Sequence, residues 1–301
     1  RTLVTSWRCV LAGLLVLAVR QPAATEATMS PRVARAETMS VRSADGVSIR
    51  YESFGRGEPA LVLVHCWSCD RHLWDAVAPR LAKQRRVVTL DLAGHGESGR
   101  DRKDWTIPAF GEDVRAVVEA LGLRKVILAG HSMGGPVILE AARRLPGRVV
   151  GLVPVDTCLN VEQTNSPEEV AGLIGGFEKD YRDTAERFTR QYMFVVKSDP
   201  ALVDRVAAKN ASAPPEIAIP CLRAAFSYDA RPTLRAVRVP AHAVNADRFP
   251  TDVEANRRHF ASYELTLMAG VGHYLMLEDP RRFSELLAGA VEQLLSAKPA
   301  R

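Results

Sequence analysis

The chain has 301 residues, with 40 Lys and Arg against 35 Asp and Glu and a net charge of +5 at pH 7. This length suits one large α/β domain or two smaller ones. The basic residues are scattered in pairs such as Arg85-Arg86 and Arg257-Arg258, with no stripe interleaved with aromatic side chains, so we expect no nucleic-acid partner.

Residues 1–27 have the layout of a secretory signal peptide. Arg1 and Arg8 precede an apolar stretch at 9–19, and small residues follow it. The stretch is too short to span a bilayer stably. We therefore expect export to the periplasm or the medium, with no stable membrane span in the mature chain. An N-terminal membrane anchor is the alternative, and residues 28–39 are predicted to be a flexible leader.

Strand and helix patterns alternate over residues 40–156. Residues 40–42 and 47–54 are predicted to form a hairpin that turns at Asp45-Gly46. The buried strands that follow are predicted at 60–65, 86–91, 125–129 and 149–156, and the helices at 72–82 and 107–121. This alternation implies crossover connections, and therefore an α/β fold with a parallel sheet.

The alternation stops over residues 157–229, where no convincing strand occurs. Prolines separate helix-like pieces at 168–182, 184–196, 202–209 and 217–228. Strand patterns return at 240–245 and 263–268, and a long helix is predicted at 280–296. We therefore predict a core made of residues 40–156 and 230–301, with a helical cap inserted at 157–229.

The segment Gly130-His131-Ser132-Met133-Gly134 has the G-x-S-x-G pattern of a nucleophile elbow. A strand pattern precedes it and a helical pattern follows, as the motif requires. The two glycines allow the helix after the turn to pass close to the strand before it. A serine hydroxyl is a weak nucleophile without an adjacent base, so Ser132 as the nucleophile requires a base and an acid elsewhere in the chain.

His273 is the predicted base, because it follows the strand at 263–268 in the loop Gly270-Val271-Gly272-His273. For the acid that orients the imidazole, we predict Asp247, just after the strand that ends at 245. Asp156, after the preceding strand, is the main rival. Asp252 is the weaker choice, since it is placed to cap the next helix. The resulting chain order of Ser, Asp and His is the one expected for this fold class.

The oxyanion hole is predicted to consist of the backbone N–H groups of Met133 and Trp67. Met133 follows the nucleophile at a helix N-terminus, where the partial positive charge is favourable, and Trp67 lies on the loop after the strand at 60–65. The side chains predicted to contribute to the substrate pocket are His65, His131, Cys158 and Tyr274. We predict no cofactor and no metal.

Beyond the signal peptide the cysteines are Cys66, Cys69, Cys158 and Cys221. In an exported protein they permit disulfides, with three possible pairings. Cys66 and Cys69 have the spacing of a redox motif but lack its βαβ setting. They are either buried small apolar residues or a disulfide that braces a loop of the active site.

These motifs resemble those of the α/β-hydrolase superfamily, over residues 40–293. The matching segments are His65-Cys66-Trp67, residues 91–98 (DLAGHGES), residues 130–135 (GHSMGG), Asn245-Ala246-Asp247 and Gly272-His273. The resemblance implies an eight-stranded, mostly parallel sheet with helices on both faces and a helical cap over 157–229. A serine nucleophile differs from the members that use Asp, which disfavours dehalogenase and epoxide hydrolase chemistry. Cys66 replaces the usual Gly of the oxyanion loop, and Asn245 replaces the Gly expected before the acid.

We therefore predict a serine hydrolase that cleaves a small or medium carboxylic ester, or a lactone, through an acyl-enzyme on Ser132. The alternatives are a cofactor-free perhydrolase of the haloperoxidase type, a C–C bond hydrolase, and a non-catalytic ligand-binding protein. The expected partner is a small ester-like molecule. The sequence predicts neither the substrate's identity nor the oligomeric state.

Overall fold

The computed structural model describes residues 37–296, so the predicted signal peptide and residues 28–36 of the predicted leader lie outside the described part of the chain. The last three leader residues belong to the first strand, β1 (Glu37–Arg42).

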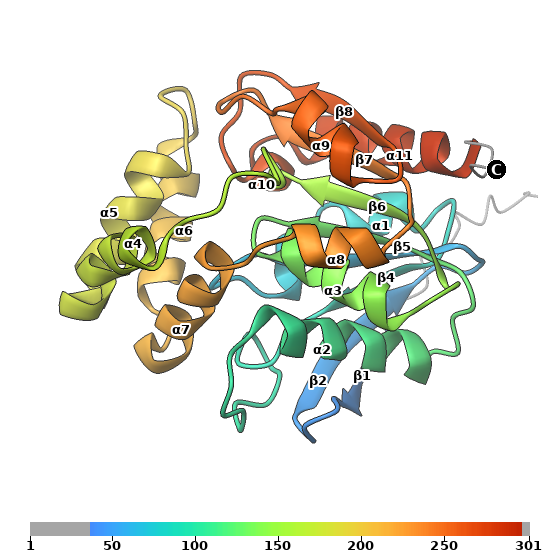
Figure 1. Ribbon diagram of the computed structural model, residues 1–301, viewed down its shortest axis with the longest axis horizontal. Helices are drawn as coiled ribbons and strands as arrows, with labels where there is room; N and C mark the ends of the chain where they lie inside the picture. The colour runs from blue at the N-terminus through green and yellow to red at the C-terminus, as the bar shows by residue number, and fades with distance from the viewer. Residues whose placement is uncertain (1–36, 297–301) are drawn as a thin grey trace, which may run out of the picture. The chain divides into compact units, whose positions relative to one another are not determined.

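An eight-stranded sheet carries the fold, in the order β1-β2-β4-β3-β5-β6-β7-β8 (Figure 1). β2 (Ser48–Phe54) pairs antiparallel with both β1 and β4 (Val87–Leu90), and the pairs beyond β4 are parallel. The remaining strands are β3 (Ala60–Val64), β5 (Val126–His131), β6 (Val149–Val155), β7 (Ala241–Ala246) and β8 (Tyr263–Met268). The predicted eight-stranded, mostly parallel sheet is confirmed.

Helices cover both faces of the sheet, which explains why its central strands are apolar throughout. Val62 and Val64 of β3 pack into one core, together with α2 (Ile107–Ala120) and α3 (Gly134–Arg144). Leu61 and Leu63 alternate with them and pack into a second core. The elements of this second face are η1 (Arg71–Trp74), α1 (Ala78–Leu81), α10 (Leu275–Glu278) and α11 (Pro280–Ser296). Parallel strands buried on both faces have this continuous apolar pattern.

Two helices differ from the prediction. The single helix predicted at 72–82 is divided into η1 and α1, because Pro79 at the start of α1 has no N–H with which to continue a helix from η1. The short helix α8 (Arg231–Ala236) was not predicted, and it precedes β7. The helix α9 (Val253–His259) follows β7, and the side chain of Asp252 caps it as expected.

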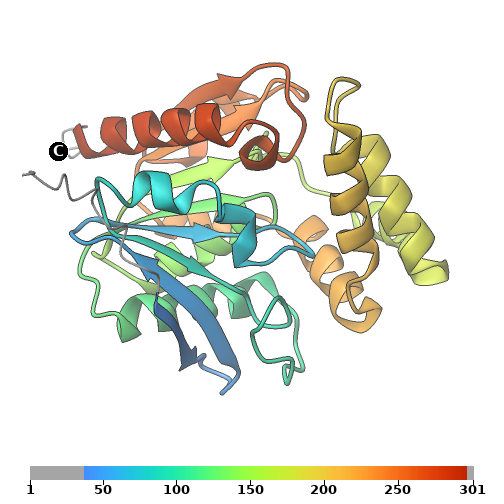
Figure 2. The ribbon, with the colours of Figure 1, turned by 180° about the vertical axis from the view of Figure 1, so that it is seen from behind.

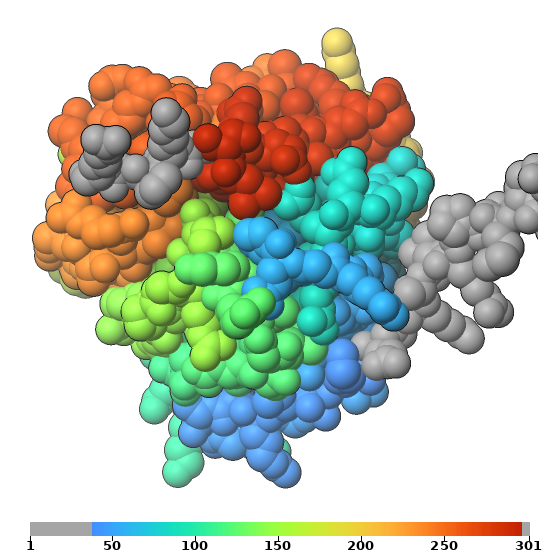
Figure 3. Space-filling view, turned by 90° about the vertical axis from the view of Figure 1, so that its right-hand side faces the viewer, coloured from blue at the N-terminus to red at the C-terminus, as the bar shows by residue number. Residues whose placement is uncertain are grey.

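Four helices lie between β6 and α8: α4 (Pro167–Lys179), α5 (Tyr181–Tyr192), α6 (Pro200–Ala211) and α7 (Pro215–Phe226). Three of them begin with a proline, where a missing N–H costs little. They stand together beyond one end of the strands in both ribbon views (Figures 1 and 2). Figure 3 shows the opposite end of the core, with these helices behind it. Within residues 37–296, no helix is both long enough and apolar enough to cross a membrane.

Candidate active site

Ser132 occupies a tight turn between β5 and α3. Its φ of +54° is left-handed, and its N–H donates to the Val155 carbonyl at 3.0 Å. A Cβ added to Gly130 would overlap the Gly134 carbonyl group, and one added to Gly134 would lie 2.7 Å from the Val64 carbonyl oxygen. Only glycine fits at both positions, because the neighbours are backbone atoms that have no freedom to move aside. The strand–turn–helix context of the motif is therefore confirmed.

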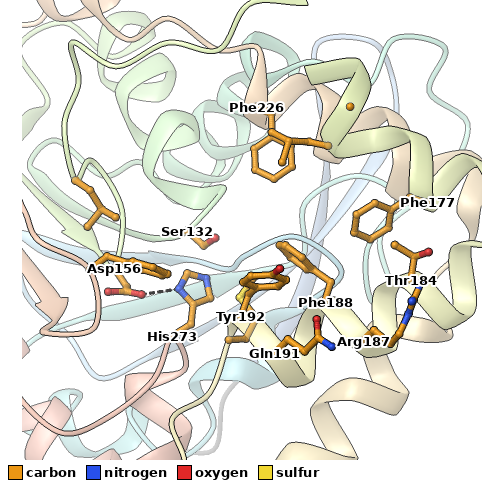
Figure 4. A pocket seen from close by; sticks show the side chains of 15 residues that line it. Ser132, Asp156, Phe177, Thr184, Arg187, Phe188, Gln191, Tyr192, Phe226 and His273 are labelled. Atoms are coloured by element: carbon orange, nitrogen blue, oxygen red, sulfur yellow. Dashed lines mark hydrogen bonds and ion pairs between the residues drawn. The ribbon is translucent and has the colours of Figure 1, made fainter. Parts of the chain in front are cut away.

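The His273 ring is oriented by a carboxylate. His273 Nδ1 lies 2.6 Å from Asp156 Oδ2, and the two side chains are only 13% and 11% exposed. The other oxygen, Asp156 Oδ1, accepts the Ala246 N–H at 2.9 Å, so both carboxylate oxygens have a fixed partner. Ser132, Asp156 and His273 line the same cavity and lie on the same side of it in Figure 4. Such an arrangement places the imidazole where its second nitrogen can serve a nucleophile.

The predicted pairing of His273 with Asp247 is wrong. Asp247 is exposed, and its Oδ1 accepts the N–H of Gly270 at 2.9 Å. Asp156 and Asp247 follow neighbouring parallel strands, β6 and β7, so each is a plausible partner from sequence. Asp156 turns toward His273 because it adopts a left-handed φ of +45° directly after β6.

Trp67 and Met133, the predicted oxyanion donors, border a smaller cavity together with Ser132 and His273. Neither backbone N–H has an acceptor within residues 37–296. The Trp67 side chain is fixed, because its indole N–H donates to the Ala218 carbonyl of α7 at 2.7 Å. Both N–H groups are therefore free to bind an oxygen atom beside Ser132.

His65 orients the peptide group that carries the Trp67 N–H. Its Nε2 accepts the Leu92 N–H at 3.0 Å, and since that amide can only donate, Nε2 carries no proton. The proton is therefore on Nδ1, which donates to the Cys66 carbonyl at 2.8 Å. Burial lowers the pKa of His65 to about 4, so the ring is neutral at pH 7. In a trans peptide the carbonyl and the N–H point in opposite directions, so holding the Cys66 oxygen aims the Trp67 N–H.

Cys66 and Cys69 form a disulfide, with their Cα atoms 5.3 Å apart. The bond closes a short loop around Trp67, so of the two interpretations the brace is the one observed. Cys158 and Cys221 are free thiols, and burial raises the pKa of each to about 12. Within residues 37–296, no three His, Cys, Asp or Glu side chains cluster in a way that would hold a metal ion.

Two cavities meet at Ser132, one of about 670 Å³ and one of about 80 Å³. Apolar side chains dominate the larger one: Leu159, Leu173, Phe177, Phe188, Tyr192, Met193, Phe226 and Phe249. Its polar wall comes from Thr184, Arg187 and Gln191 of α5 (Figure 4). These three residues and Phe188 are three or four positions apart, so they lie on one face of α5. This spacing is the sequence signal that could have identified them as lining one cavity.

Of the four side chains predicted for the substrate pocket, only Tyr274 lines one of these cavities, the smaller. His65 is fully buried behind the oxyanion loop. His131, also fully buried, has Nε2 2.8 Å from the His273 carbonyl and supports the His273 loop from behind. The backbone carbonyl of Cys158 accepts the Asn256 side-chain N–H at 2.6 Å, in the loop behind the larger cavity. These three residues are therefore structural supports, and their prediction as pocket residues is wrong.

Residues 61–286 match the model of the Alpha/beta hydrolase family. A dihydrolipoyllysine-residue acetyltransferase component of an acetoin cleaving system from Pseudomonas putida is 35% identical over 52% of this chain and 40% of its own length. A pimeloyl-[acyl-carrier protein] methyl ester esterase from Methylococcus capsulatus is 32% identical over 54% of this chain and 64% of its own length. The match thus spans less than two thirds of either relative.

Among solved structures, a thermophilic esterase from Thermogutta terrifontis superimposes with a TM-score of 0.74 at 24% identity, covering 86% of this chain and 99% of that one. This similarity extends the shared fold to almost the whole of the esterase. The family model covers most of the chain, including the elbow at Ser132, His273 and the strands that hold them. The chain belongs to the alpha/beta hydrolase family.

Proposed function

We propose that this protein is a serine hydrolase that cleaves a small or medium carboxylic ester, or a lactone, through an acyl-enzyme on Ser132. The observation that carries the proposal is the pairing of His273 with Asp156 beside Ser132, where two free N–H groups border the adjoining smaller cavity. The relative from Methylococcus capsulatus and the thermophilic esterase, both named as esterases, support the choice of an ester.

In the first half-reaction, Ser132 Oγ attacks the ester carbonyl carbon while His273 Nε2 takes the hydroxyl proton. Asp156 accepts the Nδ1–H and stabilises the imidazolium that forms. The N–H groups of Trp67 and Met133 donate to the oxyanion, and such a donor contributes about a hundredfold or more to the rate. His273 then gives its proton to the departing alcohol oxygen.

In the second half-reaction, a water molecule replaces the alcohol. His273 takes a proton from this water as its oxygen attacks the acyl carbon, and the same two N–H groups hold the new oxyanion. Collapse of the intermediate returns the proton to Ser132 Oγ and releases the carboxylic acid. Apart from the water molecule, this chain's own residues supply every group that the two half-reactions require.

Export of the protein is part of the same proposal. The Cys66–Cys69 disulfide supports it, because disulfides persist in oxidising compartments and are rare in the cytosol. Cell fractionation with an antibody against the folded protein tests this point, and recovery solely from the cytosol would contradict it.

The serine chemistry is tested with a fluorophosphonate probe, which forms a covalent bond only with an activated serine. The unmodified protein should be labelled at Ser132, and Ser132→Ala should not. Mass spectrometry of the labelled peptide identifies the site. A protein that stays unlabelled while folded, as judged by circular dichroism, would refute both the proposed hydrolase and the alternative perhydrolase and C–C hydrolase activities.

A further inference from the structure

The two cavities at Ser132 differ in enclosure as well as in size. Phe188, Met193 and Phe226 line both cavities and border the passage between them. The larger cavity reaches the surface at Leu173, Tyr192 and Phe249, which are 46%, 53% and 47% exposed. Much of the wall of the smaller cavity is buried: Cys66, Trp67, Met133, Leu222 and Tyr274 are at most 5% exposed. One cavity is therefore an open passage, and the other is a smaller chamber with a more deeply buried wall.

His273 lines both cavities, so its Nε2 can reach a leaving oxygen from either one. The oxyanion contacts Trp67 and Met133, which border the smaller cavity. The burial and size of the two cavities therefore decide which part of an ester enters each.

The order of events assigns the two parts of the ester. The alcohol leaves first and water must then reach the acyl carbon, so the departing group should occupy the open passage. The acyl group stays bound to Ser132 between the two steps, so it should occupy the smaller chamber, where it leaves the passage open to water.

The size of the smaller chamber limits the acyl group. At about 80 Å³ it has about an eighth of the volume of the larger cavity, so it favours a short acyl chain. The larger cavity, at about 670 Å³, falls in the range of sites for drug-sized ligands, and aromatic side chains from α4, α5 and α7 line it.

We propose that the substrates are short-chain acyl esters of a bulky apolar alcohol. The acyl group occupies the chamber walled by Leu222, Ala225 and Tyr274, and the alcohol occupies the cavity walled by α4 and α5. This inference rests on the proposed serine hydrolase function and adds to it which side of the ester is short.

A pair of reversed esters tests the assignment directly. Naphthalen-1-ylmethyl acetate and methyl naphthalen-1-ylacetate are isomers that place the same ring on the alcohol side or on the acyl side. The acetate should have a kcat/KM about tenfold higher or more, because the ring is too large for the smaller chamber. An equal or reversed preference would overturn the proposal.

Variants of the chamber wall supply a second test, with p-nitrophenyl acetate, butyrate and octanoate. Leu222→Ala enlarges the chamber and should raise the octanoate-to-acetate ratio of kcat/KM about tenfold. Ala225→Leu, at a half-buried position, should lower the butyrate-to-acetate ratio by a similar factor, which keeps the test valid if Leu222→Ala fails to fold. The matched control Leu173→Ala, in the wall of the larger cavity alone, should leave both ratios within about twofold. Unchanged ratios in a folded chamber variant would overturn the assignment.

The two proposals fail in distinguishable ways. If Ser132 is labelled by the fluorophosphonate but neither naphthyl ester is cleaved, the short-acyl assignment is wrong and the serine hydrolase function stands. If Ser132 is not labelled, the proposed function itself is wrong.

Discussion

Replacing Asp156 with Asn tests the pairing on which the mechanism rests. Asp156 Oδ1 accepts the Ala246 N–H, and Oδ2 accepts the Nδ1–H of His273. An Asn side chain has a single acceptor oxygen, and the Ala246 amide can only donate, so the oxygen should remain on Ala246 and the NH₂ group should face His273. His273 must then accept at Nδ1 and carry its proton on Nε2. In that tautomer it has no lone pair with which to take the proton of Ser132.

The expected magnitude follows from this change of tautomer. The Asn variant keeps the oxyanion donors, the cavities and the shape of the acid, so KM should change by no more than about threefold. In the Ser-His-Asp triad of serine proteases, the same substitution lowers kcat by about 10⁴-fold. We expect a loss of that order here, which corresponds to about 5.5 kcal/mol of activation free energy.

The assay is steady-state hydrolysis of p-nitrophenyl acetate, with Asp247→Asn as the matched control. Asp247 is exposed, and an Asn oxygen can still accept the Gly270 N–H, so its kcat should stay within about threefold of the wild type. Thermal melts establish that both variants are folded. The reasoning would be refuted if Asp156→Asn kept more than about a tenth of kcat, or if the large loss appeared in Asp247→Asn.

Three further predictions concern the elements that support the site. Burial lowers the pKa of His65 from 6.5 to about 4, so the unfolded chain binds a proton that the folded chain excludes. The free energy of unfolding, measured with urea, should therefore fall between pH 6.5 and pH 4, by up to roughly 3 kcal/mol for His65 alone. In His65→Gln, this free energy should depend less on pH. Gly134→Ala should destabilise the fold by about 2 kcal/mol or more, because its Cβ would meet the Val64 and His65 carbonyls; a thermal melt unchanged from wild type would contradict this. Replacing both Cys66 and Cys69 with Ser should lower kcat about 10- to 100-fold, because one oxyanion donor is released. The loss of stability should be only about 2 kcal/mol, because the disulfide closes a loop of just four residues. Full activity of this variant, or of wild type after a phosphine has released two further free thiols, would disprove the brace.

The sequence predicts the sheet, the elbow and the base because each depends on neighbours along the chain. Gly130 lies against the backbone carbonyl of Gly134, four residues along the chain, so the spacing of these glycines marks the turn at Ser132. The apolar strands need only burial on both faces, which the alternation of strands and helices already implies. His273 is identifiable because it is the histidine that follows a late strand on a glycine-bearing loop.

The acid and the walls of the cavities were decided by the tertiary structure. Asp156 and Asp247 each follow the carboxyl end of a parallel strand, and these strands are neighbours, so local sequence ranks them almost equally. The choice is made by two distant backbone amides, because Ala246 N–H holds the Asp156 carboxylate and Gly270 N–H holds that of Asp247. The sequence by itself thus identified Ser132 and His273 as candidates. Contacts between segments far apart in the chain determined which carboxylate pairs with His273 and how large the cavities beside Ser132 are.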